Sequence, residues 1–148
     1  MRSSSAALAL ANSAIVVALH DDNILFVTTS GADGSRLGFG LPQDRARAGE
    51  SILDCARRVL SEQLNTNVTY AALRYLGSTA LEINGQLHWQ PIVVADLGAD
   101  AAYPKDKSVL ACPYSSLDGL LASGGVAHAA SLAAIAFYGA KRRVGHLA

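Results

Sequence analysis

The chain has 148 residues, which is the length of one domain with a full hydrophobic core. Its 12 basic and 12 acidic residues cancel to a formal net charge of zero, which argues against nucleic acid or an anionic membrane as a partner. Hydrophobic residues make up 51% and charged residues only 16%, and this apolar composition favours a homodimer with a buried interface.

The first part of the chain predicts a β-hairpin. Residues 1–12 are rich in serine and alanine, and we expect a loose arm or an added edge strand there. Residues 14–19 (AIVVAL) form a nearly continuous apolar run, typical of a strand buried on both faces. After a polar turn, residues 24–29 return as the second strand. A flexible loop at 30–36 and a short strand at 37–41 lead into the next segment.

The stretch from residue 38 to residue 68 predicts a strand, a tight loop and one amphipathic helix. Ser51 is expected to cap the helix, and Asp54, three residues later, completes an S-x-x-D capping box. Asn65 can adopt the left-handed conformation that ends a helix. Apolar residues recur between these caps at four-residue spacing and form one stripe: Ile52, Ala56, Leu60 and Leu64.

The next part of the chain predicts a second hairpin and a last strand. Strand character runs through 74–83 and 86–97, around an Asn84-Gly85 pair that suits a type I′ turn because both residues tolerate positive φ. Pro91 removes one ladder donor and therefore marks a bulge or an edge position. A polar loop then leads to a short strand at 109–112.

Two helices are expected to complete the chain. Ser115 or Ser116 caps a short helix, and a closing helix covers residues 127–142. We expect the closing helix to face the core through three side chains: Leu132, Ile135 and either Phe137 or Tyr138. This order of strands and helices predicts a single α/β domain over residues 1–148, with a mixed sheet between helices.

The loop and helix also carry a motif. Leu41-Pro42 is followed by Glu50, and Arg58 stands eight residues after that glutamate. This spacing resembles the Nudix hydrolase box: a glycine, five residues, a glutamate, seven residues, then Arg-Glu-apolar-x-Glu-Glu-x-Gly-apolar, often preceded by Leu-Pro. The resemblance implies a Nudix-type α/β/α sandwich and a hydrolase of nucleoside diphosphate-linked compounds that uses Mg²⁺, or alternatively Mn²⁺.

Five positions depart from the box: Asp44 and Asn65 replace its two glycines, Val59 and Gln63 replace two of its glutamates, and Thr66 stands where an apolar residue is usual. Positions 59, 62 and 63 fall on one helix face, and the family uses three carboxylates there to hold divalent cations against a diphosphate. Only Glu62 keeps its charge. The resemblance therefore implies a degenerate metal site.

Some of these residues are candidates for a functional role, and others are expected to have a structural role. Glu62 is the candidate catalytic acid and metal ligand, or else a solvated helix residue, and Gln63 offers a cation one neutral oxygen. Glu50 and Arg58 are expected to form a structural ion pair, because an arginine and a carboxylate make a good bidentate pair. Val59 is expected to serve packing.

Other acidic residues could supply a relocated cation site: Asp44, Asp96, Asp100 and Asp106. No three of the four histidines have metal-ligand spacing, and the sequence assigns no substrate-binding residue. The two unclustered cysteines, Cys55 and Cys112, favour a reducing compartment, and with no apolar run of membrane-spanning length they predict a cytoplasmic protein.

Three functions fit these observations. The first is a binding or regulatory module for a small nucleotide derivative or other ligand, with weak or no hydrolysis and at most a weakly held Mg²⁺. The second is an active Mg²⁺-dependent hydrolase with a relocated metal site. The third is a scaffold or interaction protein without a ligand. The loss of charge at positions 59 and 63 favours the first.

Overall fold

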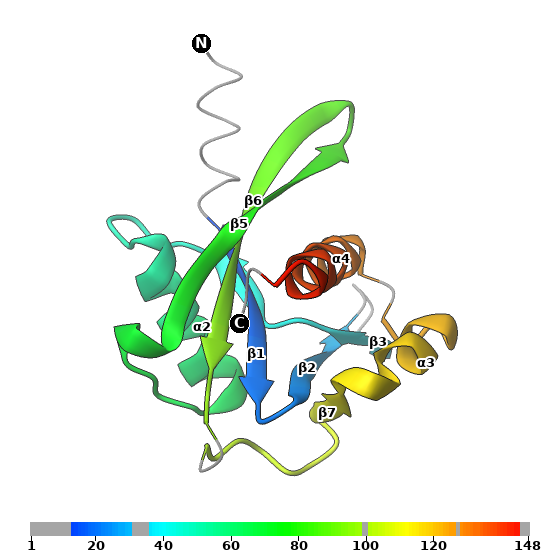
Figure 1. Ribbon diagram of the computed structural model, residues 1–148. Coiled ribbons are helices and arrows are strands. Elements are labelled where there is room, and N and C mark those ends of the chain that lie inside the picture. The colour runs from blue at the N-terminus through cyan, green and yellow to red at the C-terminus, as the bar shows by residue number, and fades with distance from the viewer. Residues whose placement is uncertain (1–12, 31–35, 99–100, 127, 146–148) are drawn as a thin grey trace.

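The structure is a computed structural model that describes residues 13–30, 36–98, 101–126 and 128–145 (Figure 1). The loose arm expected at 1–12 and most of the loop expected at 30–36 lie outside these residues. The elements, in chain order, are β1 (Ser13–His20), β2 (Asn23–Ser30), β3 (Arg36–Gly40), β4 (Gln43–Arg45), α2 (Ile52–Leu64), the 3₁₀ turn η1 (Tyr70–Ala72), β5 (Leu73–Ile83), β6 (Gln86–Asp96), β7 (Val109–Pro113), the 3₁₀ turn η2 (Tyr114–Ser116), α3 (Leu117–Ala122) and α4 (Ala129–Arg143).

The strands of the described residues form one mixed sheet. Its central order is β3-β2-β1-β6-β5, while β4 pairs with β1 and β7 pairs with β2. Strand β1 is antiparallel to β2 and parallel to β6, with Ile15 opposite Ile92. Both of its edges are therefore paired, and residues 14–18 are fully buried, as the continuous apolar run predicts.

Helices cover both faces of the sheet, so the predicted α/β/α sandwich is confirmed. Side chains of β1 alternate between two cores, because successive residues of a strand point to opposite faces. Ile15 and Val17 belong to the core under α3 and α4. Ala14, Val16 and Ala18 belong to the core under α2. Figure 1 shows α2 on one side of the sheet and α4 on the other.

The hairpin of β5 and β6 extends beyond the rest of the sheet (Figure 1). Asn84 and Gly85 have φ values of 52° and 78°, which confirms the predicted turn. Pairing between β6 and β1 begins at Ile92, directly after Pro91, and β5 has a bulge between Tyr75 and Gly77. The outer half of β6 therefore pairs with β5 alone.

Three local expectations differ from the structure. Leu132 is 39% exposed, whereas Ile135 and Tyr138 face the core as expected, together with Ala134. Ser116 stands at the N-cap of α3 but its side chain makes no cap hydrogen bond. Strand β4, within the loop before α2, was not expected. In the part of the chain that the structure describes, no helix is long and apolar enough to cross a membrane.

Candidate functional site

Helix α2 begins and ends where its caps predict. Ser51 Oγ accepts a hydrogen bond of 3.1 Å from the main-chain N–H of Asp54. At the other end Asn65 has φ 50° and ψ 38°, the left-handed conformation that stops a helix. The Asp54 carboxylate accepts a hydrogen bond from the Tyr70 hydroxyl. The caps fix the two ends of the helix, and the Tyr70 contact joins its first turn to η1.

Arg58, on α2, makes several hydrogen bonds to the loop that carries Asp44 and Glu50. Its Nε and Nη2 donate to the two carboxylate oxygens of Glu50 at 2.9 and 3.0 Å, a bidentate pair. Its Nη1 donates to Asp44 at 3.0 Å and to Glu62 at 2.8 Å. Its Nη2 also donates to the carbonyl of Arg45 at 2.7 Å. One guanidinium therefore holds three carboxylates and the main chain of β4.

This arrangement sets the charges of the cluster. The hydrogen bonds from Arg58 lower the pKa of Glu50 to about 2. A hydrogen bond from Arg58 and one from the Arg45 main chain lower the pKa of Asp44 as well. The same carboxylates, Glu50 first, raise the pKa of Arg58. At neutral pH all three groups are charged, and the arginine provides the positive charge that the carboxylates face.

The three positions of the family's metal-binding face do not converge on a cation site. Both carboxylate oxygens of Glu62 bond to arginines, at 2.8 Å from Arg58 and 3.2 Å from Arg47. Gln63 Nε2 donates at 2.9 Å to the main-chain carbonyl of Gln43. Val59 is fully buried in the core under α2. These residues do not fit Mg²⁺, which prefers free carboxylate and water oxygens.

Of the other acidic candidates, Asp44 belongs to this cluster, whereas Asp96 and Asp106 lie apart from it. Asp96 accepts a hydrogen bond from the main-chain N–H of Gly98, and Asp106 accepts one from Ser108, so both close local turns. Asp100 lies outside the described residues. Over 13–30, 36–98, 101–126 and 128–145, no group of three or more His, Cys, Asp or Glu side chains could hold a metal ion.

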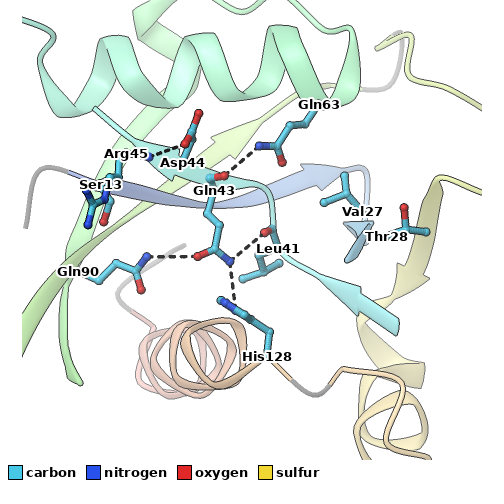
Figure 2. A pocket seen from close by; sticks show the side chains of 10 residues that line it. All are labelled: Ser13, Val27, Thr28, Leu41, Gln43, Asp44, Arg45, Gln63, Gln90 and His128. Atoms are coloured by element: carbon cyan, nitrogen blue, oxygen red, sulfur yellow. Dashed lines mark hydrogen bonds between the residues drawn. The ribbon is translucent and has the colours of Figure 1, made fainter. Parts of the chain in front are cut away.

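Beside the arginine cluster lies an open cavity of about 610 Å³ (Figure 2). It is bounded by the start of β1, the end of β2, the segment through β4, helix α2, strand β6 and the start of α4. Its lining residues are Ser13, Val27, Thr28, Leu41, Gln43, Asp44, Arg45, Gln63, Gln90 and His128. Most are polar, and three are glutamines from three different elements.

Gln43 occupies the middle of this cavity. Figure 2 shows its side chain pointing from β4 toward His128, with Gln90 beside it. Its Nε2 lies 3.2 Å from His128 Nδ1 and donates to the Leu41 carbonyl at 3.4 Å. Its Oε1 accepts from Gln90 Nε2 at 3.4 Å. Its own carbonyl accepts from Gln63, so both its main chain and its side chain bind neighbouring amides.

His128 joins the cavity to helix α4. Its Nδ1 accepts from the main-chain N–H of Ser131 at 3.3 Å and thus caps the helix. Because Nδ1 accepts this bond, the ring proton of the neutral imidazole is on Nε2. Ser131 Oγ in turn accepts from the buried main-chain N–H of Leu41 at 2.9 Å. The start of α4 and the segment before α2 are therefore bonded together.

Sequence reasoning missed the residues at the centre of this cavity. Gln43 follows the Leu-Pro pair, and its place beside the box-like stretch was the one available signal. Gln90 precedes Pro91 in a long strand, and His128 precedes a helix by one residue. Neither position carries a pattern that separates it from other polar residues, because their meeting depends on the sheet order.

Comparisons with known proteins place the fold. No protein-family model matches the sequence, and no curated protein sequence matches it significantly. An ADP compounds hydrolase has a TM-score of 0.71 at 17% identity, over 91% of this chain and 75% of that one. The E. coli ORF135 protein has a TM-score of 0.69 at 15% identity, over 92% and 93%. A Nudix hydrolase from Nitrosomonas europaea has a TM-score of 0.65 at 15% identity, over 86% of this chain and 87% of that one. The chain therefore has the fold of Nudix hydrolases.

Proposed function

We propose that this Nudix-fold chain is a binding or regulatory module that takes a small nucleotide derivative or another ligand in the cavity and hydrolyses diphosphates weakly or not at all. The observation that supports the proposal is the set of hydrogen bonds that Glu62 makes. It is the one acidic residue kept on the metal-binding face of the resembled box, and both its oxygens bond to arginines.

A divalent cation at this face would meet strong competition. It would have to displace Arg58 or Arg47 from Glu62 and remain close to their positive charges. It would also gain no carboxylate from Gln63, whose amide nitrogen faces the Gln43 carbonyl. Metal-dependent hydrolysis relies on a cation that neutralises the diphosphate and activates water. The residues of α2 offer no free carboxylate to hold such a cation. Binding without turnover therefore fits this chain best.

The direct test is turnover by the wild-type protein on a panel of nucleoside diphosphate derivatives, with Mg²⁺ and with Mn²⁺. We expect rates far below about 1 per second, the lower end of ordinary enzyme rates. Turnover at or above that rate would overturn the proposal in favour of an active hydrolase with a relocated metal site. Binding of Mn²⁺ measured by electron paramagnetic resonance gives a second readout, and no binding is expected at micromolar Mn²⁺.

One variant matches this test. Gln63→Glu returns a carboxylate to a position that is only partly buried and leaves the core intact. Val59→Glu is not suitable, because Val59 is fully buried and a carboxylate there would lie in an apolar core. Gain of Mn²⁺ binding in Gln63→Glu, with none in the wild type, supports the loss of a metal site. Equal and tight Mn²⁺ binding by both proteins would contradict it.

A further inference from the structure

We propose that the cavity takes an uncharged planar group with a hydrogen-bond donor and an acceptor side by side, such as the lactam or amidine edge of a nucleobase, and takes it without a metal ion. The inference rests on the proposed binding function and names the class of ligand. It is carried by the amide groups of the cavity, by its charge and by one buried oxygen.

The amide groups define the hydrogen bonding that the cavity offers. Gln43, Gln63 and Gln90 come from β4, α2 and β6 and line the same space (Figure 2). A primary amide presents a donor and an acceptor in one plane, and it can pair with a group that presents the complementary two. A glutamine bound to the edge of a purine is the familiar example of such a pair.

The charge of the lining disfavours a diphosphate. Among the lining residues, Asp44 is the one carboxylate and Arg45 the one permanent cation, so the lining has no excess of positive charge. Asp44 keeps its negative charge because Arg58 lowers the pKa of its carboxyl group. A diphosphate brings several negative charges and, among the lining residues, would meet one permanent cation, Arg45, because the nearby Arg58 is already bonded to Asp44, Glu50 and Glu62. An uncharged ligand meets no such imbalance.

The pairing of Gln43 with Gln90 is weak and leaves one buried acceptor unsatisfied. Their side chains meet at 3.4 Å, a long hydrogen bond compared with the usual distance of about 2.9 Å. Gln90 Oε1 is buried and, among the described residues, no donor reaches it. A buried acceptor without a donor has a free-energy cost. A ligand N–H that reached this oxygen after a small side-chain rotation would remove that cost.

The size and walls of the cavity fit the same ligand. A volume of about 610 Å³ falls within the range of small-molecule pockets. Val27 is partly exposed and gives the lining an apolar surface on which the face of a planar ring can lie. The hydrogen bond from Gln63 to the Gln43 carbonyl is shorter, at 2.9 Å, and holds the far wall in place while the Gln43 and Gln90 side chains turn to the ligand.

The experiment compares uncharged and anionic probes in a buffer with a chelator. Isothermal titration with adenosine, guanosine, cytidine and uridine measures binding of the uncharged class, while ADP and inorganic pyrophosphate measure the anionic class. We expect at least one nucleoside to bind, with an affinity that added Mg²⁺ does not change. Gln90→Leu is expected to weaken that binding about tenfold, the loss of one hydrogen bond. Gln43→Leu is the second variant, with the same expectation.

Gln86→Leu is the matched control, because Gln86 is exposed on the same strand and does not line the cavity. It is expected to leave the affinity within about twofold. Thermal unfolding of each variant shows whether it is folded. Binding of ADP or pyrophosphate without any nucleoside overturns the ligand class and leaves the binding function standing. Binding of no probe also overturns the ligand class. Rapid hydrolysis together with metal-independent nucleoside binding overturns the proposed function alone.

Discussion

The side-chain amide of Gln63 donates a 2.9 Å hydrogen bond to the main-chain carbonyl of Gln43. This contact ties α2 directly to β4 with no ion between them. A carboxylate at position 63 would set two oxygen acceptors face to face, and such a pair needs a bridging cation or proton to be stable. The glutamine therefore makes the junction of helix and strand independent of metal.

Replacing Gln63 with glutamate is expected to make the stability of this junction depend on a metal ion. Gln63→Glu is expected to lower the free energy of unfolding by about 1–2 kcal/mol in a chelator, because one hydrogen bond is lost and two acceptors face each other. Added Mn²⁺ is expected to recover part of the loss in the variant and to leave the wild type unchanged. Denaturant unfolding with and without Mn²⁺ measures both. A wild type that Mn²⁺ stabilises as much as the variant would contradict this prediction.

Arg58 is expected to contribute far more to the free energy of unfolding than Arg47. The Arg58 side chain is 12% exposed and contacts three carboxylates, while Arg47 is 67% exposed and its side chain pairs with Glu62. Arg58→Ala leaves Glu50 without its counter-charge and is expected to cost about 2–4 kcal/mol of unfolding free energy. Arg47→Ala, the control, is expected to cost about 0.5 kcal/mol or less. Similar losses in chemical denaturation would show that the cluster is not organised by Arg58.

Glu50 predicts a dependence of stability on pH. Its pKa falls from 4.5 to about 2 on folding, mainly because Arg58 donates to its charged form. A lowered folded pKa means that the unfolded chain binds more protons, so this stabilisation is complete above the unfolded value of 4.5 and is lost as the pH falls toward 2.

Glu50→Gln is expected to be less stable at neutral pH and to lose less of its stability over that acid range. Some slope remains in the variant, because Arg58 also lowers the pKa of Asp44. Glu82→Gln, an exposed change on β5, serves as the control and is expected to keep the wild-type slope. Urea unfolding at a series of pH values measures the slopes. A Glu50→Gln slope equal to that of the wild type would contradict the assignment.

Gly77 is expected to tolerate no side chain. It has φ +151° in the bulge of β5, and an added Cβ would lie 2.7 Å from Cζ of Phe137 on α4. Gly77→Ala is expected to destabilise the protein by about 1–3 kcal/mol through overpacking. Gly119→Ala on α3, where a Cβ meets nothing within 4 Å, is expected to be neutral or stabilising. A second change, Phe137→Leu, is expected to recover part of the loss. Additive losses in thermal unfolding would show that ring and bulge are not coupled.

We expect the protein to be a homodimer in solution. Its composition is apolar, and Tyr75, Leu87 and Trp89 on the β5–β6 hairpin are 50–59% exposed. Light scattering at micromolar concentration is expected to give twice the chain mass of 15.4 kDa. Leu87→Glu combined with Trp89→Gln is expected to favour the monomer, while Leu132→Gln on α4 is the control. A monomer mass for the wild type would refute the expectation.

The fold could be predicted because its signals are local. The apolar run at 14–19 indicates a doubly buried strand, Asn84-Gly85 indicates a hairpin, and Ser51 with Asn65 delimits α2. Each follows from backbone or burial preferences of a few neighbouring residues. The closing helix was also predicted, but part of its buried face was predicted wrongly. Its packing depends on small residues such as Ala134, which carry a weak apolar signal.

The cavity could not be predicted in the same way. Gln43, Gln90 and His128 are polar residues far apart in sequence, and β6 must lie beside β1 before Gln90 and Gln43 meet. Motif reasoning located the loop and helix, expected Val59 to serve packing, and offered Glu62 and Gln63 as candidate metal ligands. In the folded chain Val59 turns into the core and Glu62 to the arginines, because α2 presents different sides to the sheet and to the loop.

The bond between Leu41 and Ser131 joins residues that are 90 positions apart, and that between Gln43 and His128 spans 85. While the chain is being synthesised, β1, β2 and α2 leave the ribosome long before α4 does. The wall contributed by α4 is therefore added after the others, and a nascent chain that has not reached His128 lacks part of the cavity lining. A ligand of this cavity would therefore favour chains in which the start of α4 has already packed against the segment before α2.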